Sequence, residues 1–201
     1  MNPEDLQHLR HSLAHLLAAA VLELYPDAKR TIGPAIDDGF YYDFAFSTPI
    51  SEEDLPKIEA KMRELMPDWS RFDRKEMTAV EARSMFADNK YKVELIDEFA
   101  GDGQTLTLYT SGNYSDLCRG GHADGIAALD PQCFSLTKLA GAYWRGDEHN
   151  DMLTRIYGIA FATKAERDAH LAMLEEAKKR DHRKLGVELD LFAFSPLVGP
   201  G

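Results

Sequence analysis

The sequence predicts an α+β domain in which helices pack on an antiparallel sheet. One observation behind this prediction is a long amphipathic helical pattern at residues 3–24. A second is a series of short runs rich in β-branched and aromatic residues, mixed with shorter helical segments and separated by turn residues. The chain has 201 residues with 44% hydrophobic content, which is enough for one domain with a sizeable core.

The first helix is expected at residues 3–24. Asn2 is a favoured N-cap, Pro3 is favoured at the first helical position, and two acidic residues follow in the first turn. Leucine and alanine recur at spacings of three and four along this segment, so one face of the helix is expected to be buried. The sequence Tyr25-Pro26-Asp27 ends the helix.

A β-hairpin and a second helix are expected next. Residues 31–46 hold β-branched and aromatic side chains on both sides of Asp37-Asp38-Gly39, which is typical of a hairpin turn. Ser51 then begins a helix that ends near Met66, with Asp54 at its third position.

The middle of the chain is expected to hold two more helices and four strands. Thr78 and Glu81 form a capping box for a short helix to about residue 87, and residues 91–99 form another helix. A glycine-rich loop is expected at residues 118–125. The strand-like runs lie at residues 71–77, 106–110, 134–139 and 155–161.

The last helix is expected to leave the domain. Thr163 and Glu166 form another capping box, and the mostly polar sequence behind it suits a connecting helix to about Leu185 better than a core helix. We therefore divide the chain into a domain at residues 1–162 and, at residues 163–201, a linker helix with the start of a connection to a further domain. A basic cluster in this region is either a local RNA contact or a solvated helix face: Lys178, Lys179, Arg180, Arg183 and Lys184.

The charge and the cysteine content exclude several kinds of protein. A net charge of −11 argues against RNA binding by broad electrostatic attraction, so any RNA contact must be local. The two cysteines do not make a disulfide framework. The N-terminus lacks the pattern of a signal peptide, and the chain has no apolar run of membrane-spanning length. We expect a cytoplasmic protein that does not bind membranes.

Two pairs of residues indicate a site with chemistry. His11 and His15 are four residues apart on the first helix, so their imidazoles project from one face. Cys118 and His122 are also four residues apart, in the glycine-rich loop. By residue type these four could bind zinc in a tetrahedral set, although each pair alone is common by coincidence. Spacing does not decide whether Tyr41 or Tyr42 reaches such a site.

Longer motifs reveal a resemblance. They are RHSLAHLL at residues 10–17, IGPAIDDGFYYDF at 32–44, YKVEL at 91–95, DLCRGGH at 116–122, AGAYWRGD at 140–147 and RDHRKLG at 180–186. In sequence and in order they resemble the editing domain of threonyl-tRNA synthetases and its linker to the catalytic core. One residue departs from the family pattern, because Gly121 replaces a proline and frees the backbone before His122.

The resemblance implies the threonyl/alanyl-tRNA synthetase editing-domain fold and a hydrolytic proofreading activity. The substrate would be tRNA(Thr) that carries serine, because a synthetic site for threonine cannot reject an amino acid that lacks one methyl group strongly enough. The catalytic and anticodon-binding domains, with the ATP and zinc sites of the full synthetase, would lie outside this chain. The chain alone would therefore not charge tRNA, and a homodimer is expected only for the full-length enzyme.

The resemblance also implies roles for individual residues. His11 and Lys92 would position or deprotonate the attacking water, and Asp116 would hold the serine ammonium group. His15, Cys118 and His122 would complete the catalytic site, with Tyr42 and Gly33 among the substrate-binding residues. No cofactor is implied for editing.

Three alternatives stay open. Zinc could be bound by His11, His15, Cys118 and His122. The chain could then be a zinc-stabilised, non-catalytic tRNA-binding module. It could also be a free-standing deacylase that edits in trans.

Overall fold

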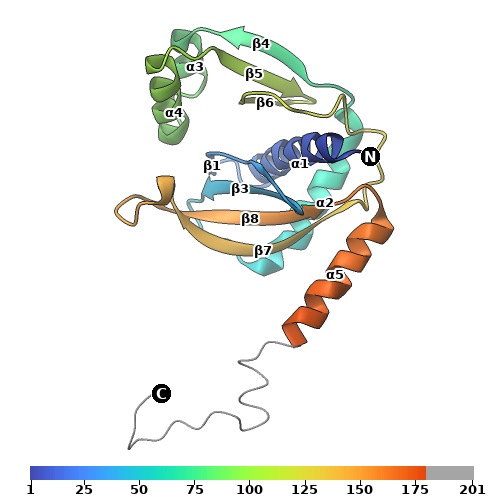
Figure 1. Ribbon diagram of the computed structural model, residues 1–201. Coiled ribbons are helices and arrows are strands. Elements are labelled where there is room, and N and C mark those ends of the chain that lie inside the picture. Colours follow the sequence, from blue (N-terminus) through green and yellow to red (C-terminus); the bar gives the residue numbers. More distant parts are fainter. Residues whose placement is uncertain (180–201) are drawn as a thin grey trace, which may run out of the picture.

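The computed structural model describes residues 1–179 and places the first helix between two antiparallel sheets (Figure 1). The larger sheet has the strand order β1-β3-β8-β7, with β2 also paired to β3. The smaller sheet has the order β4-β5-β6. The prediction of an α+β fold with antiparallel strands is confirmed, but the strands form two sheets where one was expected.

The central helix α1 (Pro3–Leu24) begins and ends where the sequence predicts. The Asn2 side chain caps it by accepting a hydrogen bond from the backbone of Asp5 at 2.8 Å. Every residue from Ser12 to Val21 is buried, so the expectation of a single buried face was too narrow. Helix α1 contacts α2 and the larger sheet, and it lies below the smaller sheet. Its alanines are therefore buried as well as its leucines.

The larger sheet is built around β3 (Gly39–Ala45), which β1 (Lys29–Arg30) and β2 (Ala35–Ile36) flank. The predicted hairpin turn at Asp37-Asp38 joins β2 to β3. The sheet continues through β8 (Met152–Ala160) to β7 (Phe134–Tyr143). Alternation along β3 buries Tyr42 against α1, while Tyr41 contacts Tyr157 on the neighbouring strand.

The smaller sheet contains β4 (Asp73–Met77), β5 (Leu106–Ser111) and β6 (Tyr114–Leu117). Strand β6 was not predicted, because Tyr-Ser-Asp-Leu is short and half polar. It forms because Gly112, at φ 54°, allows a tight turn back onto β5. Helix α3 (Ala79–Met85) starts at the predicted Thr78–Glu81 capping box, and α4 (Lys90–Gly101) follows it.

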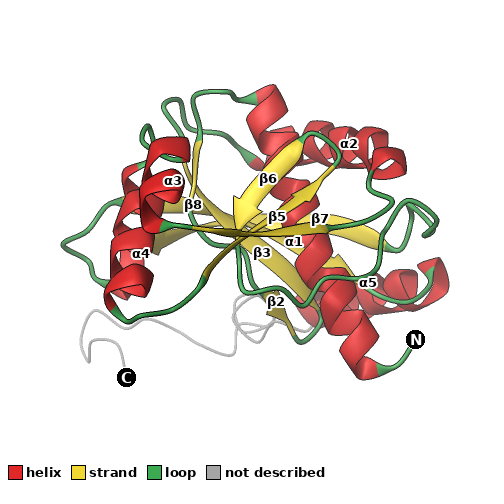
Figure 2. Cartoon of the chain, turned by 90° about the horizontal axis from the view of Figure 1, so that it is seen from above, coloured by secondary structure: helices red, strands yellow, loops and turns green. Residues whose placement is uncertain are grey.

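Helix α2 (Leu55–Leu65) buries Ile58 and Met62 in the same core as α1. Short 3-10 turns at Glu52–Asp54 and Met66–Asp68 flank it, so the segment that the sequence predicts as one helix is divided in three. Seen from above, α3 and α4 lie on one side of the molecule, and α2 and α5 lie on the other (Figure 2).

Helix α5 (Lys164–Lys179) projects from the end of the larger sheet (Figure 1). The predicted capping box is present, since Thr163 accepts from the Glu166 backbone and Glu166 accepts from the Thr163 backbone. None of the α5 side chains that the structure describes is buried. The predicted continuation to Leu185 and the basic residues at 180–184 lie outside the described residues, and the division at residue 162 stays a prediction. Across residues 1–179, no helix has both the length and the apolar character that a membrane span needs.

The central position of α1 leads to a stability prediction. Leu13 is fully buried in the main core, so Leu13→Ala is expected to lower the free energy of unfolding by about 2 to 5 kcal/mol. Val80→Ala is the control, because Val80 is 74% exposed and its change should stay within about 0.5 kcal/mol. Urea unfolding at pH 7 measures both changes. A loss of the same size in the two variants would contradict the central role of α1.

Candidate active site

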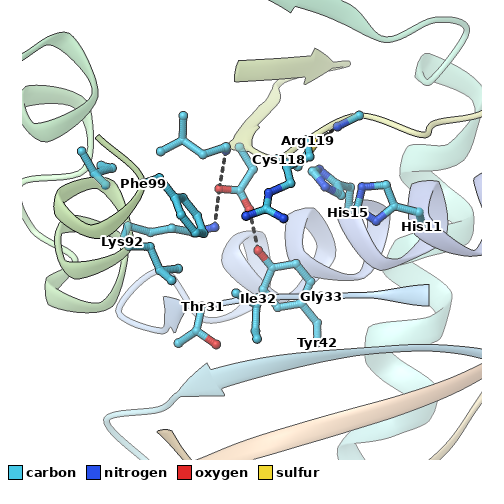
Figure 3. Close-up of a pocket in the computed structure, with 15 residues that line it drawn as sticks. His11, His15, Thr31, Ile32, Gly33, Tyr42, Lys92, Phe99, Cys118 and Arg119 are labelled. Atoms are coloured by element: carbon cyan, nitrogen blue, oxygen red, sulfur yellow. Dashed lines mark hydrogen bonds and ion pairs between the residues drawn. The ribbon is translucent and has the colours of Figure 1, made fainter. Parts of the chain in front are cut away.

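A cavity of about 250 Å³ lies where α1, β3, α4 and the loop after β6 meet. Figure 3 shows its wall, with two histidines from α1, Lys92 and Phe99 from α4, and Tyr42 from β3. Cys118, Arg119 and Gly120 of the loop complete one side, and Thr31, Ile32 and Gly33 complete another. The cavity thus collects polar side chains from segments that are far apart in the sequence.

The two histidine and cysteine pairs converge at this cavity. One donor atom from each of His11, His15, Cys118 and His122 lies within 4.8 Å of those of the other three. The Cys118 Sγ is 3.1 Å from Nε2 of His122. The His11 and His122 rings are stacked with centroids 4.5 Å apart, and His15 meets His122 edge-on at 4.6 Å. His122 itself lines an adjoining cavity with His8 rather than the first one.

Aromatic and hydroxyl groups hold His122 in this position. The Phe72 ring stacks on it at 4.1 Å, almost parallel. The Ser12 Oγ is 3.5 Å from Nδ1 of His122 and accepts a hydrogen bond from the Ala123 backbone at 3.0 Å. Sequence reasoning missed Ser12 and Phe72, because neither residue type marks a site by itself.

The loop depends on two glycines. Gly120 and Gly121 have φ values of 92° and 81°, in the left-handed region that favours glycine. Proline, with its φ fixed near −65°, cannot adopt the conformation that Gly121 has here. Gly121, which replaces the proline of the family pattern, therefore has a backbone conformation that proline could not adopt.

Asp116 is the centre of a buried polar cluster next to these histidines. Its Oδ2 accepts hydrogen bonds from the hydroxyls of Tyr42 at 2.5 Å and Tyr114 at 2.9 Å. Its Oδ1 is 2.8 Å from the Lys92 Nζ and 3.4 Å from the Arg30 Nε. The Leu117 backbone also donates to Oδ1 at 2.9 Å. Both carboxylate oxygens are therefore fully engaged by the protein itself.

The cluster holds two cations around one anion. Burial alone would raise the pKa of Asp116, but Lys92, Arg30 and His15 outweigh this effect and keep the pKa well below its usual value. Burial lowers the pKa of Lys92, which is only 3% exposed, although Asp116 partly offsets this effect. Arg30, which also lies close to Asp116, lowers the pKa of Lys92 further because the two cations repel each other. Loss of the Lys92 proton would leave a neutral pair of Arg30 and Asp116.

The imidazoles are in their neutral form at neutral pH. Burial, together with repulsion from His11 and His8, lowers the pKa of His122 to about 3. Burial, His11 and His122 place the pKa of His15 well below its ordinary value. The pKa of His11 is also lowered by burial, partly offset by a hydrogen bond with the Gly33 backbone and by Asp116. Burial raises the pKa of Cys118 to about 12, so it is a thiol. Neutral imidazoles can accept a proton from water or bind a metal.

Helix α4 carries Lys92 to the cavity, and the tip of the β7–β8 hairpin anchors this helix. The Trp144 indole donates to Glu94 at 2.9 Å and its ring packs against Tyr91. Arg145 pairs with Glu94 at 2.7 Å and with Glu98, although its own φ of 57° is unusual for a residue other than glycine. The AGAYWRGD motif at residues 140–147 therefore lines none of the cavity but contacts the helix that bears Lys92.

Gly33 lies against Tyr42 on the cavity wall. A Cβ atom at this position would come within 2.0 Å of the Tyr42 Cδ2, so a larger residue would push the tyrosine away from Asp116. Seven of the eight predicted site residues line the cavity, and the eighth, His122, contacts Cys118 beside it. Arg30 and Tyr114 were missed, because one lies on a strand of two residues and the other on the unpredicted β6.

Comparisons with known proteins give this site a context. No family model matches the chain. It is 53% identical over 201 residues to the threonine–tRNA ligase of Rubrobacter xylanophilus, with 100% of this chain and 31% of that protein covered. It is 52% identical over 192 residues to the threonine–tRNA ligase of Borrelia duttonii, with 96% of this chain and 33% of that protein covered.

The chain is homologous to a segment of threonyl-tRNA synthetases. It spans about a third of the length of the curated relatives that it matches. The resemblance to threonyl-tRNA synthetases that the motifs indicated is thereby confirmed.

The depressed histidine pKa values predict a loss of stability in acid. The folded-state pKa of His122 is about 3 and its unfolded value is about 6.5. Because the unfolded chain binds more protons below pH 6.5, the free energy of unfolding should fall as the pH is lowered from there towards 3. His122→Gln should reduce the loss between pH 7 and pH 5 by roughly 2 kcal/mol.

Urea unfolding at both pH values, with a chelator present, measures this difference. His149→Gln is the matched control, because His149 lies exposed on the hairpin tip and its ion pair with Asp147 is exposed as well. Exposed ion pairs contribute little, so the loss of stability between pH 7 and pH 5 should stay close to that of the wild type. An unchanged pH dependence in His122→Gln would show that His122 is not held neutral by the fold.

Proposed function

We propose that the chain hydrolyses the ester that joins serine to wrongly charged tRNA(Thr). The observation that carries this proposal is the convergence of Lys92, His11, His15 and Cys118 on one cavity, with His122 beside Cys118, in a chain homologous to threonyl-tRNA synthetases. Ester hydrolysis needs a group that can take a proton from water near neutral pH. Burial lowers the pKa values of both Lys92 and His11, which moves both groups towards the range in which they can accept a proton.

In the proposed reaction, water attacks the carbonyl carbon of the seryl ester. Lys92 or His11 takes a proton from this water, the bond between the carbonyl carbon and the ribose oxygen breaks, and the ribose oxygen receives a proton. The products are free serine and uncharged tRNA. His15 and Cys118 also line the cavity and His122 lies beside Cys118, and these three residues orient the water or the terminal ribose.

The structure supports a different role for Asp116 from the one that the resemblance implied. Its oxygens already accept from Lys92, Tyr42, Tyr114 and the Leu117 backbone, and its side chain is 1% exposed. A serine ammonium group would have to displace one of these donors. We propose that Asp116 positions Lys92 and Tyr42, and that Tyr42 and Gly33 shape the binding surface.

A zinc-stabilised module that binds tRNA without catalysis is the second candidate, because the donor atoms of His11, His15, Cys118 and His122 lie within 4.8 Å of one another. These residue types fit a tetrahedral zinc site, in which they would bind the ion and stabilise the loop after β6. Binding would also require Cys118 to lose its proton. The effect of a chelator on serine release distinguishes this candidate from the metal-free proposal.

The proposed function predicts a selective and chelator-resistant activity. The chain should release serine from seryl-tRNA(Thr) much faster than threonine from threonyl-tRNA(Thr), because a pocket can exclude an added methyl group by steric clash. Serine release should continue at the same rate with EDTA present. Measurements use radiolabelled amino acids on tRNA(Thr). Equal rates on both substrates would contradict the exclusion of threonine by the pocket. Activity that is lost with EDTA and restored by zinc would favour a metal bound by His11, His15, Cys118 and His122.

A second prediction concerns Lys92. Lys92→Met removes the amine but keeps most of the side-chain volume, so kcat for serine release should fall by at least about 100-fold, within the usual range for loss of a general base. The folded state should persist, with a cooperative urea transition. Lys75→Met, on the exposed strand β4, is the matched control and should keep wild-type kcat. Unchanged serine release in Lys92→Met would remove this residue from the mechanism.

A further inference from the structure

Arg119 lies at the mouth of the cavity, directly after Cys118. Its side chain is exposed, and it lines the cavity together with Phe99 of α4. The guanidinium carbon is 5.1 Å from the centre of the Phe99 ring. One guanidinium nitrogen donates to the side-chain oxygen of Gln104 at 3.0 Å. Figure 3 shows Arg119 extending from the loop on the cavity side that also carries Cys118.

The groups that orient Arg119 do not neutralise it. Phe99 and Gln104 are uncharged, and among the described residues no carboxylate forms an ion pair with Arg119 within 4.0 Å. The only other lysine or arginine on the cavity wall, Lys92, is buried and paired with Asp116. Arg119 is therefore the exposed positive charge of this wall. Its partners fix its direction at low entropic cost and leave most of its N–H groups free.

The charge of the whole chain makes this arginine unusual. With a net charge of −11, the protein repels an RNA backbone at long range. Most arginines and lysines that the structure describes are paired with carboxylates, as Arg74 is with Glu76 and Arg83 is with Asp97. An unpaired arginine at the entrance of a cavity can offset this repulsion locally, because its planar fork of donors matches the oxygens of a phosphate.

We propose that Arg119 binds a backbone phosphate near the 3′ end of the tRNA, at the mouth of the cavity. This inference rests on the proposed function, which places the seryl ester inside and requires the RNA strand to leave through the opening. Arg119 then contributes to substrate binding and leaves the chemical step to the groups inside the cavity. Phe99 and Gln104 hold the guanidinium group in place before the RNA arrives.

The test measures the binding of uncharged tRNA(Thr) at a series of salt concentrations. Arg119→Ala should weaken binding several-fold and lower the slope of log K against log salt by about 0.7 to 0.9, which is the contribution of one phosphate contact. Arg119→Lys keeps the charge and should keep the slope. Lys57→Ala is the matched control, because Lys57 is an exposed cation on α2 that lines none of the cavity. It should change neither the affinity nor the slope.

Serine release from seryl-tRNA(Thr) separates this inference from the proposed function. Arg119→Ala should raise KM several-fold and keep kcat within about twofold, since the arginine makes no contact with the reacting ester. A weaker affinity with an unchanged salt slope would mean that Arg119 contacts a base, which overturns the phosphate contact. Wild-type binding and slope in Arg119→Ala would overturn it as well. If the wild-type chain binds tRNA through Arg119 but releases no serine, the proposed function fails and the phosphate contact stands.

Discussion

Asp116 forms the contacts on which the other parts of the site depend. A buried carboxylate is costly unless hydrogen bonds and opposite charges compensate it, and Asp116 receives both from four different segments. Arg30 reaches it from β1, Tyr42 from β3, Tyr114 from its own strand β6, and Lys92 from α4. Since β3 belongs to the larger sheet and β6 to the smaller one, this single anion links the two sheets and fixes the cavity between them.

The same burial determines the chemistry that the site can perform. Low exposure favours the uncharged forms of the histidines and of Cys118 and lowers the pKa of Lys92, whereas Lys92 and Arg30 together keep Asp116 ionised. A group of neutral bases next to a fixed ion pair suits proton transfer from water, because each base can accept a proton without losing an existing ionic partner. The donor geometry of the histidines and Cys118 would also suit a metal.

The cavity is positioned by contacts outside it. The hairpin tip at Trp144 and Arg145 holds α4 through Glu94, and α4 in turn presents Lys92 to Asp116. Most of the strength of this contact comes from the packing of Trp144 with Tyr91 and Leu153, since ion pairs as exposed as that of Arg145 and Glu94 contribute little. At the mouth, Phe99 of the same helix orients Arg119. Helix α4 thus positions both Lys92 inside the cavity and Arg119, the proposed RNA contact, at its mouth.

The sequence by itself determined the elements with strong local signals. Asn2 and Pro3 marked the start of α1, the Thr78 and Thr163 capping boxes marked two more helices, and the spacing of His11 and His15 placed both on one helical face. Long motifs pointed to residues that the structure brings to one cavity or beside it. Strand β6, the division into two sheets, and the roles of Arg30 and Tyr114 were decided only by the tertiary structure. These features depend on pairing and charge compensation between segments that are distant in the chain, and no local pattern records such contacts.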